Sequence, residues 1–425
     1  MKASAAMLPP AISYRRTSVR LLNYLLNHLQ RLGIGRIDLS AQRLLDDACK
    51  ATGLWDFGSD PFLEPFHVLL DALNNEANLH PAGRYLNRLS LLRILKHRLW
   101  AENLFQRHPE ILQRPLKSPV VIVGLARSGT TRLHRLLATD RRFCHLRAWE
   151  AINPVPWPGS FTARRDPRLS NVETVAKMIL YISPQIAHIH PIAVHEAEEE
   201  AGLLQHAFSS KVFEVQARVP SFARWLVDND QRYAYDYMAK LLKLCNWFRH
   251  DAVDHPWILK TPQHMQDLDA LIDVFPDAKL IFIHRDPVKA VGSACSLVWN
   301  TIVRDSDSVD PLAIGRDWSA NTLLMISKTL RVRHEKIAAD RQLDILYDDM
   351  NRNWRATMQR IYQFIGWPFC EQAERGMQRW LDNNRQHKHG AHHYSLRDFG
   401  LQQSLLEREL AFYRRRFSIP VEPIS

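Results

Sequence analysis

One loop in this chain has the composition of an anion-binding turn. Residues 124–131 read Gly-Leu-Ala-Arg-Ser-Gly-Thr-Thr, and the apolar run at 119–123 leads directly into them. A buried strand, a glycine turn and the start of a helix direct backbone N–H groups and the positive end of a helix dipole to one point. The residues that we expect to hold a phosphate-like group are Arg127, Ser128, Gly129, Thr130 and Thr131.

This P-loop-like turn differs from the loop that ATP- and GTP-hydrolysing proteins use. Their pattern places Lys and then Ser or Thr after the last glycine, whereas here Gly129 is followed by Thr130. The nearest cation, Arg127, lies inside the loop. A nucleoside triphosphate with magnesium would lack its usual charge partner here, so the loop points away from a standard ATPase.

A second candidate anion site follows a later apolar run. Arg285-Asp-Pro follows residues 279–283 after one intervening residue, His284, and Ser293 stands eight residues beyond Arg285, in what should be the next helix. A guanidinium on the loop and a hydroxyl about two turns further can hold a second phosphate. The alternative is a simple ion pair of Arg285 with Asp286 or another acid. We favour the phosphate because the glycine loop precedes it.

Strands and helices that alternate along the chain must position these groups. Four short runs predict strands, and patterns at helical spacing follow them. The first three runs are largely apolar, and the fourth contains Asp344. The runs are residues 119–123, 257–259, 279–283 and 343–347. This alternation predicts an α/β fold with a doubly wound, mostly parallel central sheet, in which 257–283 form a βαβ unit. Lys260, Arg285 and Tyr347 each follow a run, so we expect them to converge with the loop at the carboxyl edge of the sheet.

The rest of the chain predicts helical additions to this sheet. With 425 residues, 46% of them hydrophobic, the chain can bury a large core. We expect residues 1–118 to form a helical N-terminal region packed on the core, and residues 119–425 to form one α/β domain. Within it, residues 150–250 should form helical insertions that shape the acceptor site. We expect most aromatic residues there to pack in the core and a subset to line an apolar pocket. They are Trp149, Trp157, Phe161, Tyr181, Phe208, Phe213, Phe222 and Trp225.

The N-terminal segment is basic and amphipathic. No acidic residue precedes Asp38. Cations surround an apolar series at helical spacing: Leu21, Tyr24, Leu25, Leu29 and Leu32. The pattern permits peripheral membrane contact through a surface helix. We favour the other interpretation, an amphipathic helix packed on its own domain.

The net charge and the cysteines limit which binding partners and which cellular compartment we expect. The net charge of +11 is compatible with three kinds of binding partner: a nucleic acid, an anionic membrane or an anionic small molecule. Nucleic acid is the weakest option, because the chain has no common nucleic-acid-binding module. The five cysteines are widely spaced and include no Cys-x-x-Cys pair, which argues against disulfides and a zinc ribbon. We expect a soluble protein of the cytoplasm, since no apolar stretch has the length of a membrane helix or the form of a leader.

The combination of motifs resembles the sulfotransferases that use 3′-phosphoadenosine 5′-phosphosulfate (PAPS), in particular their large bacterial branch. The resemblance covers most of the chain. Further segments similar to that branch are Trp149-Glu150, Glu196-Ala-Glu-Glu-Glu200 and His393-Tyr-Ser-Leu-Arg-Asp-Phe-Gly400. It implies transfer of a sulfonate from PAPS to a hydroxyl or amine of a small molecule, lipid or glycan, without a metal.

The resemblance also implies roles for residues at matching positions. The 127–131 loop would hold the 5′-phosphosulfate, Arg285 and Ser293 the 3′-phosphate, and Tyr347 would neighbour the adenine. The segment 257–264 resembles the strand that carries a catalytic lysine and histidine, here Lys260 and His264. A basic C-terminal flap containing Lys388 and His389 would close over the nucleotide.

Two departures from the family pattern concern the loop cation and the histidine. Many animal members have lysine where Arg127 stands, and their Lys-Thr-His run is here Lys260-Thr261-Pro262, with His264 two places later. Lys260 could follow the charge onto the bridging oxygen. For the base that takes the acceptor proton, we weigh His264, Glu150 and Glu199 within the acidic cluster.

Three alternatives stay open at this point. One is a phosphotransferase that uses ATP, and another is an inactive nucleotide-binding or scaffold protein. A metal site is the third, because histidines gather in two groups, but neither group has the spacing of a recognisable zinc site. The groups are His188, His190 and His195, and His387, His389, His392 and His393.

Overall fold

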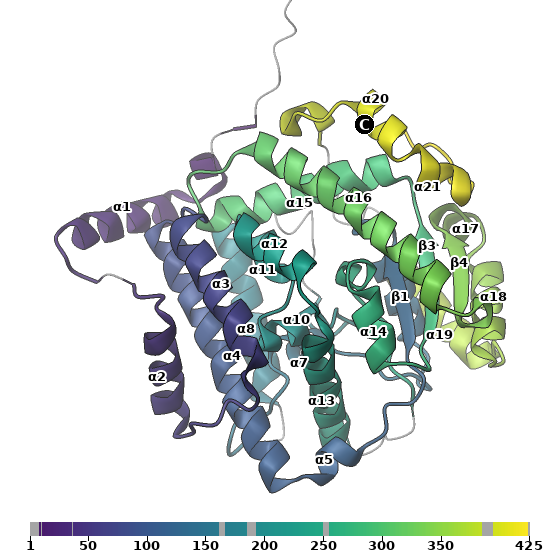
Figure 1. The fold of residues 1–425 in the computed structure, drawn as a ribbon, viewed down its shortest axis with the longest axis horizontal. Helices are drawn as coiled ribbons and strands as arrows, with labels where there is room; N and C mark the ends of the chain where they lie inside the picture. The colour runs from purple at the N-terminus through teal and green to yellow at the C-terminus, as the bar shows by residue number, and fades with distance from the viewer. Residues whose placement is uncertain are drawn as a thin grey trace, which may run out of the picture.

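The computed structural model describes residues 8–9, 11–35, 37–160, 166–184, 193–249, 255–384 and 394–423. Helices make up most of this part of the chain, and a four-stranded sheet lies among them (Figure 1). The strands are β1 (Val120–Gly124), β2 (Ile258–Lys260), β3 (Lys279–His284) and β4 (Gln342–Leu346). Their order is β2-β1-β3-β4, and all neighbours are parallel. The predicted α/β fold with a parallel central sheet is confirmed.

Each predicted strand is present to within one residue at either end. The strands of the predicted βαβ unit, β2 and β3, are parallel and belong to one sheet, but they are not neighbours in it. β1 lies between them and pairs with both, through Val121 with Leu259 of β2 and Leu280 of β3. Apolar periodicity reports that a strand is buried, but it carries no information about which strand lies beside it.

Many helices surround the sheet and extend beyond it. Those before β1 are α1 (Thr17–Arg31), α2 (Ala41–Thr52), α3 (Leu63–Asn75), α4 (Pro81–Arg107) and α5 (Glu110–Gln113). Between β1 and β2 come α6 (Thr130–Leu137), α7 (Ala148–Ile152), α8 (Pro167–Ile182), α10 (Ala201–Leu204), α11 (Val212–Gln216), α12 (Pro220–Asp228) and α13 (Arg232–Arg249). After β2 come α14 (Leu268–Val274), α15 (Pro287–Asp305), α16 (Pro311–Lys336), α17 (Tyr347–Arg352), α18 (Trp354–Ile365), α19 (Glu371–Asn383), α20 (Gln403–Glu409) and α21 (Ala411–Arg416).

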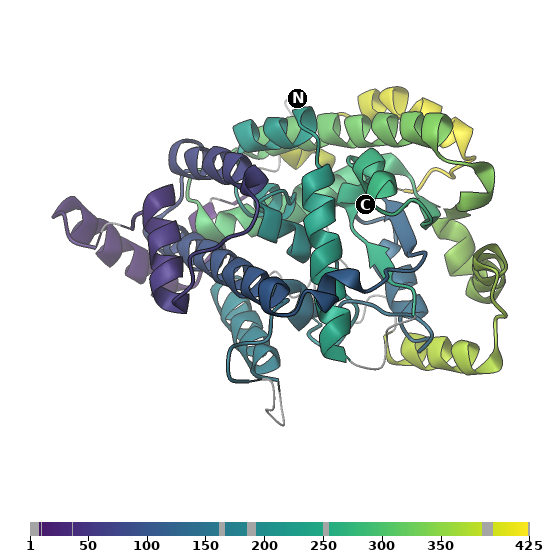
Figure 2. The same cartoon turned by 60° about the horizontal axis from the view of Figure 1, so that its bottom comes forward.

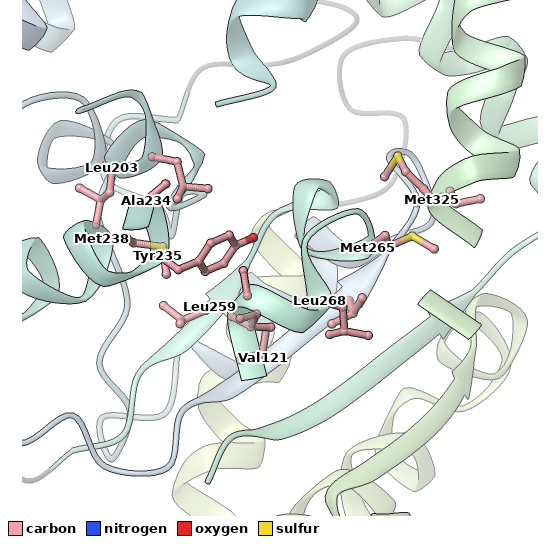
Figure 3. Close-up of a cluster of buried hydrophobic side chains, with 14 of the residues drawn as sticks. Val121, Leu203, Ala234, Tyr235, Met238, Leu259, Met265, Leu268 and Met325 are labelled. Atoms are coloured by element: carbon pink, nitrogen blue, oxygen red, sulfur yellow. The ribbon is translucent and has the colours of Figure 1, made fainter. Parts of the chain in front are cut away.

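Alternate side chains of β1 enter two different cores. Val120 and Ile122 pack with apolar residues of α6, α18 and α19 on one face. Val121 and Val123 pack on the other face with residues of α13, α14, α15 and α16. Figure 3 shows part of that second core, where Val121 and Leu259 lie close to Leu268 of α14. Because both faces of β1 are covered, its residues form a continuous apolar run, whereas the edge strand β4 is partly exposed and carries Asp344 at its centre.

The N-terminal helices form a further core together with the 150–250 region. Apolar residues of α2, α3 and α4 pack with Phe208, Phe213 and Phe222. The rings of Phe66 and Phe208 have centroids 4.6 Å apart. The helical character expected before residue 118 is thus present in the described part, whereas the domain boundary between residues 118 and 119 stays a prediction.

α1 packs on the domain through an unexpected face. Val19 and Asn23 are its buried residues, and Asn23 Oδ1 accepts a hydrogen bond from the backbone N–H of Ala82 at the start of α4 (3.0 Å). The leucines that we expected to pack inward are exposed, including Leu21 and Leu25. None of the helices that the structure describes is long and apolar enough to cross a membrane.

Candidate active site

The loop between β1 and α6 is bent tightly against Tyr347. α6 begins at Thr130, directly after Gly129, whose φ is +88°. A Cβ atom at position 129 would lie 2.6 Å from Cδ2 of Tyr347, so the position requires glycine. Arg127 has a φ of +68°, which is uncommon for a residue with a side chain and typical of functional turns. The turn brings the α6 N-terminus to the carboxyl edge of the sheet, as anion binding requires.

The hydroxyl groups of the loop have different surroundings. Ser128 is buried, and its hydroxyl donates a hydrogen bond to the carbonyl oxygen of Leu125 (2.6 Å), which closes the turn. Thr130 is also buried. Thr131 is half-buried, and its hydroxyl accepts a hydrogen bond from the ammonium group of Lys260 (3.2 Å). Thr131 therefore links the loop to the end of β2.

Two arginines from distant parts of the sequence meet at this loop. Arg285 Nη1 donates to the carbonyl oxygen of Arg127 (2.5 Å), and Arg127 Nε donates to the hydroxyl of Ser293 (3.0 Å). The Arg285 guanidinium lies 4.2 Å from the ring centroid of Tyr347. Burial, and then the positive charge of Arg285, lower the pKa of Arg127. Two like charges in a partly buried site create a strong local preference for an anion.

Lys260 joins the phosphate loop to an acidic residue of the pocket. Its side chain is buried, and besides the bond to Thr131 its ammonium pairs with the carboxylate of Glu199. The backbone N–H of Lys260 donates to the carboxylate of Glu200 (2.9 Å). Two neighbouring residues of the acidic segment thus have different roles. Glu200 is buried and accepts a hydrogen bond from the backbone of β2, whereas Glu199 is partly exposed and pairs with the Lys260 side chain.

His264 is buried beneath the site. It lies in a 3₁₀ turn, Pro262–Met265, and its side chain is 0% exposed. Nδ1 is 2.9 Å from the hydroxyl of Tyr235, and Nε2 bonds the carboxylate of Glu200. Because both ring nitrogens have protein partners, the geometry gives His264 a positioning role through Glu200, and a direct role as base stays without structural support.

Glu150 lies in a separate ion pair. It belongs to α7, where it accepts a hydrogen bond from the N–H of Arg147 (3.0 Å) and pairs with the guanidinium of Arg249. Burial alone would raise the pKa of Glu150, but the charge and hydrogen bonds of Arg249 hold the pKa below its ordinary value. Shortly before α7, Cys144 forms an isolated parallel bridge with Trp257. These surroundings suit a structural carboxylate better than a base.

A pocket of about 1150 Å³ leads away from these groups. Its polar end contains Arg127, Gly129, Thr131, Arg285 and Tyr347, with Glu198 and Glu199 beside them. Much of the remaining lining is aliphatic and comes from α4, α8 and α15, namely Leu86, Leu89, Val172, Val175, Ile179, Ile182, Leu297 and Val298. Polar side chains, among them Asn87, Arg93 and Arg304, and the rings of Trp318, Trp354 and Trp380 line other parts of it. The expectation that aromatics of the 150–250 region line the pocket was wrong for those that the structure describes. Their place is taken by aliphatic residues of α8, whose orientation no motif specified.

Several predicted residues lie outside the described part of the chain. These are Lys388, His389, Phe161, His188, His190, His387, His392 and His393. The described His195 lies 3.9 Å from a carboxylate oxygen of Glu173. Within the described ranges, no group of three or more His, Cys, Asp or Glu side chains is arranged to hold a metal ion.

Two residues near the arginine pair were missed by the sequence reasoning. The hydroxyl of Tyr394 donates to the carbonyl oxygen of Lys289 (3.0 Å), and burial raises the pKa of Tyr394 to about 12, although Arg285 and Arg127 act in the opposite direction. Glu422 forms a bidentate ion pair with Arg285, through Nε (2.7 Å) and Nη2 (2.6 Å). Tyr394 lies in the segment 393–400 that resembles the bacterial branch, whereas no sequence signal indicated Glu422.

The fold and the site together define a group-transferring enzyme of the P-loop-like class. The chain belongs to the sulfotransferase family, whose model matches residues 119–371. It is 25% identical over 283 residues to the omega-hydroxy-beta-dihydromenaquinone-9 sulfotransferases of Mycobacterium bovis and Mycobacterium tuberculosis, covering 63% of this chain and 67% of theirs. The chain is therefore a sulfotransferase, and the ATP-dependent and inactive alternatives are set aside.

Solved structures support the same assignment. Sulfotransferase STF9 from Mycobacterium avium matches with a TM-score of 0.81 and 28% identity, over 91% of this chain and 98% of that one. Sulfotransferase STF1 from Mycobacterium tuberculosis matches with a TM-score of 0.77 and 29% identity, over 89% of this chain and all of the other (100%). The similarity extends beyond residues 119–371 and includes much of the helical additions.

Proposed function

We propose that this chain transfers the sulfonate of PAPS to an alcohol on an apolar, lipid-like acceptor. The observation that carries the proposal is the position of Lys260. Its ammonium contacts Thr131 of the phosphate loop on one side and Glu199 of the pocket wall on the other. A donor in the loop and an acceptor in the pocket would therefore meet at this lysine.

We assign the donor to the polar end of the pocket. The loop from Arg127 to Thr131 would hold the 5′-phosphosulfate, and Arg285 with Ser293 would hold the 3′-phosphate. The mutual repulsion of Arg127 and Arg285 supports this, because a bound anion would relieve it. Tyr347 lies against both Gly129 and Arg285, which suits the neighbour of a nucleotide base. These cations come from the chain itself, so the assignment does not call for a metal.

We propose Glu199 as the base and Lys260 as the cation for the leaving group. Transfer forms a bond between the acceptor oxygen and sulfur and breaks the bond between sulfur and the bridging oxygen, whose electron pair stays with the departing phosphate. The acceptor proton goes to Glu199. A protonated Glu199 no longer holds the ammonium, so Lys260 becomes free to turn toward the leaving oxygen, on the side where Thr131 already contacts it.

The aliphatic walls support a lipid-like acceptor over a glycan. Sugars require many hydrogen-bonding groups, whereas α4, α8 and α15 present mostly aliphatic side chains to the pocket. The mycobacterial relatives are named as sulfotransferases of omega-hydroxy-beta-dihydromenaquinone-9. We place the reaction in a reducing compartment such as the cytoplasm, an assignment supported by the five cysteines, which are all thiols.

Transfer of labelled sulfur from PAPS to primary alcohols of increasing chain length tests this function. Each additional methylene that the walls bury should raise kcat/KM by about fourfold, until the pocket is filled, because burying one methylene is worth about 0.8 kcal/mol. Sugars and short polar alcohols should be poor acceptors. A rate that does not change with chain length, or a preference for sugars, would contradict the lipid-like acceptor.

A carboxylate currently takes the place that we assign to the 3′-phosphate. Glu422 occupies two donors of Arg285, so a phosphate must displace it. We expect Glu422→Gln to bind adenosine 3′,5′-bisphosphate about 3- to 10-fold more tightly, since a neutral amide competes less well for a guanidinium than a carboxylate does. Isothermal titration would measure the change.

The same titration includes its own controls. Glu409→Gln, at an exposed position of α20, should leave the affinity unchanged. Arg285→Ala should weaken it by about 10- to 100-fold, because charged hydrogen bonds contribute roughly 1.5–3 kcal/mol. Weaker binding by Glu422→Gln would mean that Glu422 supports the nucleotide site instead of competing for it.

A further inference from the structure

α1 exposes a continuous apolar face to solvent. Five leucines of this helix and its C-terminal end are 41–62% exposed: Leu21, Leu22, Leu25, Leu29 and Leu32. At about 100° per residue they fall on one arc of the helix, roughly opposite Val19 and Asn23, which contact the domain. We call these five residues the leucine face. A contiguous group of exposed leucines is uncommon on a protein surface and is typical of an interaction site. We therefore expect the leucine face to contact a partner.

The charged residues of α1 and its N-cap are all positive. Arg16, Arg20 and Arg31 are exposed, and no acidic residue precedes Asp38 in the sequence. A basic amphipathic helix with an apolar face is the form that lies in the interface of an anionic bilayer. α1 carries no acid that could pair with these cations across a symmetric contact with a second copy.

The leucine face continues onto the mouth of the acceptor pocket. The start of α1 touches the end of α8, where Ser18 and Tyr181 share a hydrogen bond between hydroxyls (3.1 Å) and the Arg16 guanidinium lies 4.6 Å from the Tyr181 ring centroid. Two pocket-lining residues nearby are themselves exposed, Met178 of α8 (40%) and Leu89 of α4 (42%). Figures 1 and 2 place α1 at one end of the molecule, away from the sheet.

We propose that the leucine face of α1, together with Met178 and Tyr181 of α8, docks on an anionic lipid bilayer and opens the acceptor pocket toward the lipid. The inference rests on the proposed function for the identity of the acceptor, but docking itself requires neither PAPS nor acceptor. The leucines enter the interfacial region of the bilayer, and Arg16, whose guanidinium lies against Tyr181, contacts the lipid phosphates. The acceptor then passes from the bilayer between α4 and α8 to Glu199 without crossing water.

Vesicle co-sedimentation of the full chain, without nucleotide or acceptor, tests the docking. The protein should bind vesicles of phosphatidylcholine with phosphatidylglycerol and should bind pure phosphatidylcholine and high-salt samples more weakly. Leu25→Glu should lower the affinity by about tenfold or more, because it puts a carboxylate at the centre of the apolar arc. The matched control is Leu405→Glu on α20, an exposed leucine on a helix that lies apart from α1 in both views.

The outcomes separate bilayer docking from misfolding and from self-association. Titration with adenosine 3′,5′-bisphosphate shows that Leu25→Glu is folded if its affinity equals that of the unaltered chain. Failure of the unaltered chain to bind anionic vesicles, or equal binding by Leu25→Glu, overturns the proposal. A dimer in analytical ultracentrifugation that Leu25→Glu dissociates, without vesicle binding, assigns the face to a second copy. Vesicle binding without any sulfonate transfer to lipid alcohols leaves the docking intact and contradicts the proposed function.

Discussion

Lys260→Met is expected to lower kcat by about 10²- to 10³-fold and to change the affinity for adenosine 3′,5′-bisphosphate by less than about threefold. The lysine contacts the phosphate loop through Thr131, but the arginine pair supplies the charge for the product nucleotide. Removing the ammonium therefore removes a stabilising group that matters when the sulfur–oxygen bond breaks. Methionine keeps most of the volume of this buried side chain, so the change should be chemical.

Steady-state kinetics with labelled PAPS and titration of the product nucleotide would measure both quantities. Lys336→Ala, at an exposed position near the end of α16, is the matched control and should have the kcat of the unaltered enzyme. Lys260→Arg should recover part of the rate, because it restores a positive charge with a different shape. An unchanged kcat for Lys260→Met would remove Lys260 from the chemical step.

Glu199→Gln is expected to lower kcat by about 10²-fold or more with aliphatic alcohols, since a positioned base contributes about 10²- to 10⁴-fold. The amide cannot accept the acceptor proton, and it also ends the ion pair with Lys260. The loss should shrink for phenols, because an acidic hydroxyl needs less help from a base in the transition state. Rates measured over alcohols and phenols of graded acidity would give this dependence.

The acidic run provides the control for this variant. Glu198 also lines the pocket, and its carboxylate accepts a hydrogen bond from the N–H of Glu199 (3.0 Å). Glu198→Gln keeps an acceptor for that bond and should stay within about threefold of the unaltered enzyme. If the two variants lose the same activity, or if Glu199→Gln loses equally with alcohols and phenols, then neither carboxylate is the base and the assignment fails.

The sequence by itself determined the elements whose signals are local. The strands were predictable because each is a short run that ends at a turn or at the start of a helix, and three of the four runs are largely apolar, as buried strands are. The 124–131 loop and Arg285 were predictable as well. The spacing of the glycines indicates a tight turn, and a cation directly after a strand indicates a position at the edge of the sheet. Their convergence also followed, since parallel strands bring their carboxyl ends to one edge of a sheet.

Only the tertiary structure determined the order of the strands and the surroundings of the individual acidic and basic side chains. The order β2-β1-β3-β4 depends on how crossover helices pack, and no residue pattern encodes it. The sequence left His264, Glu150 and Glu199 all open as bases, because residue type is the same whether a side chain faces Tyr235, Arg249 or a pocket. The exposure of the leucine face of α1 depends on which side of that helix packs on the domain, and the pairing of Glu422 with Arg285 joins residues that are far apart in the sequence. Which side chains are buried and which groups they contact are properties of the folded molecule. They determine the protonation, the solvent exposure and the mobility of each functional side chain.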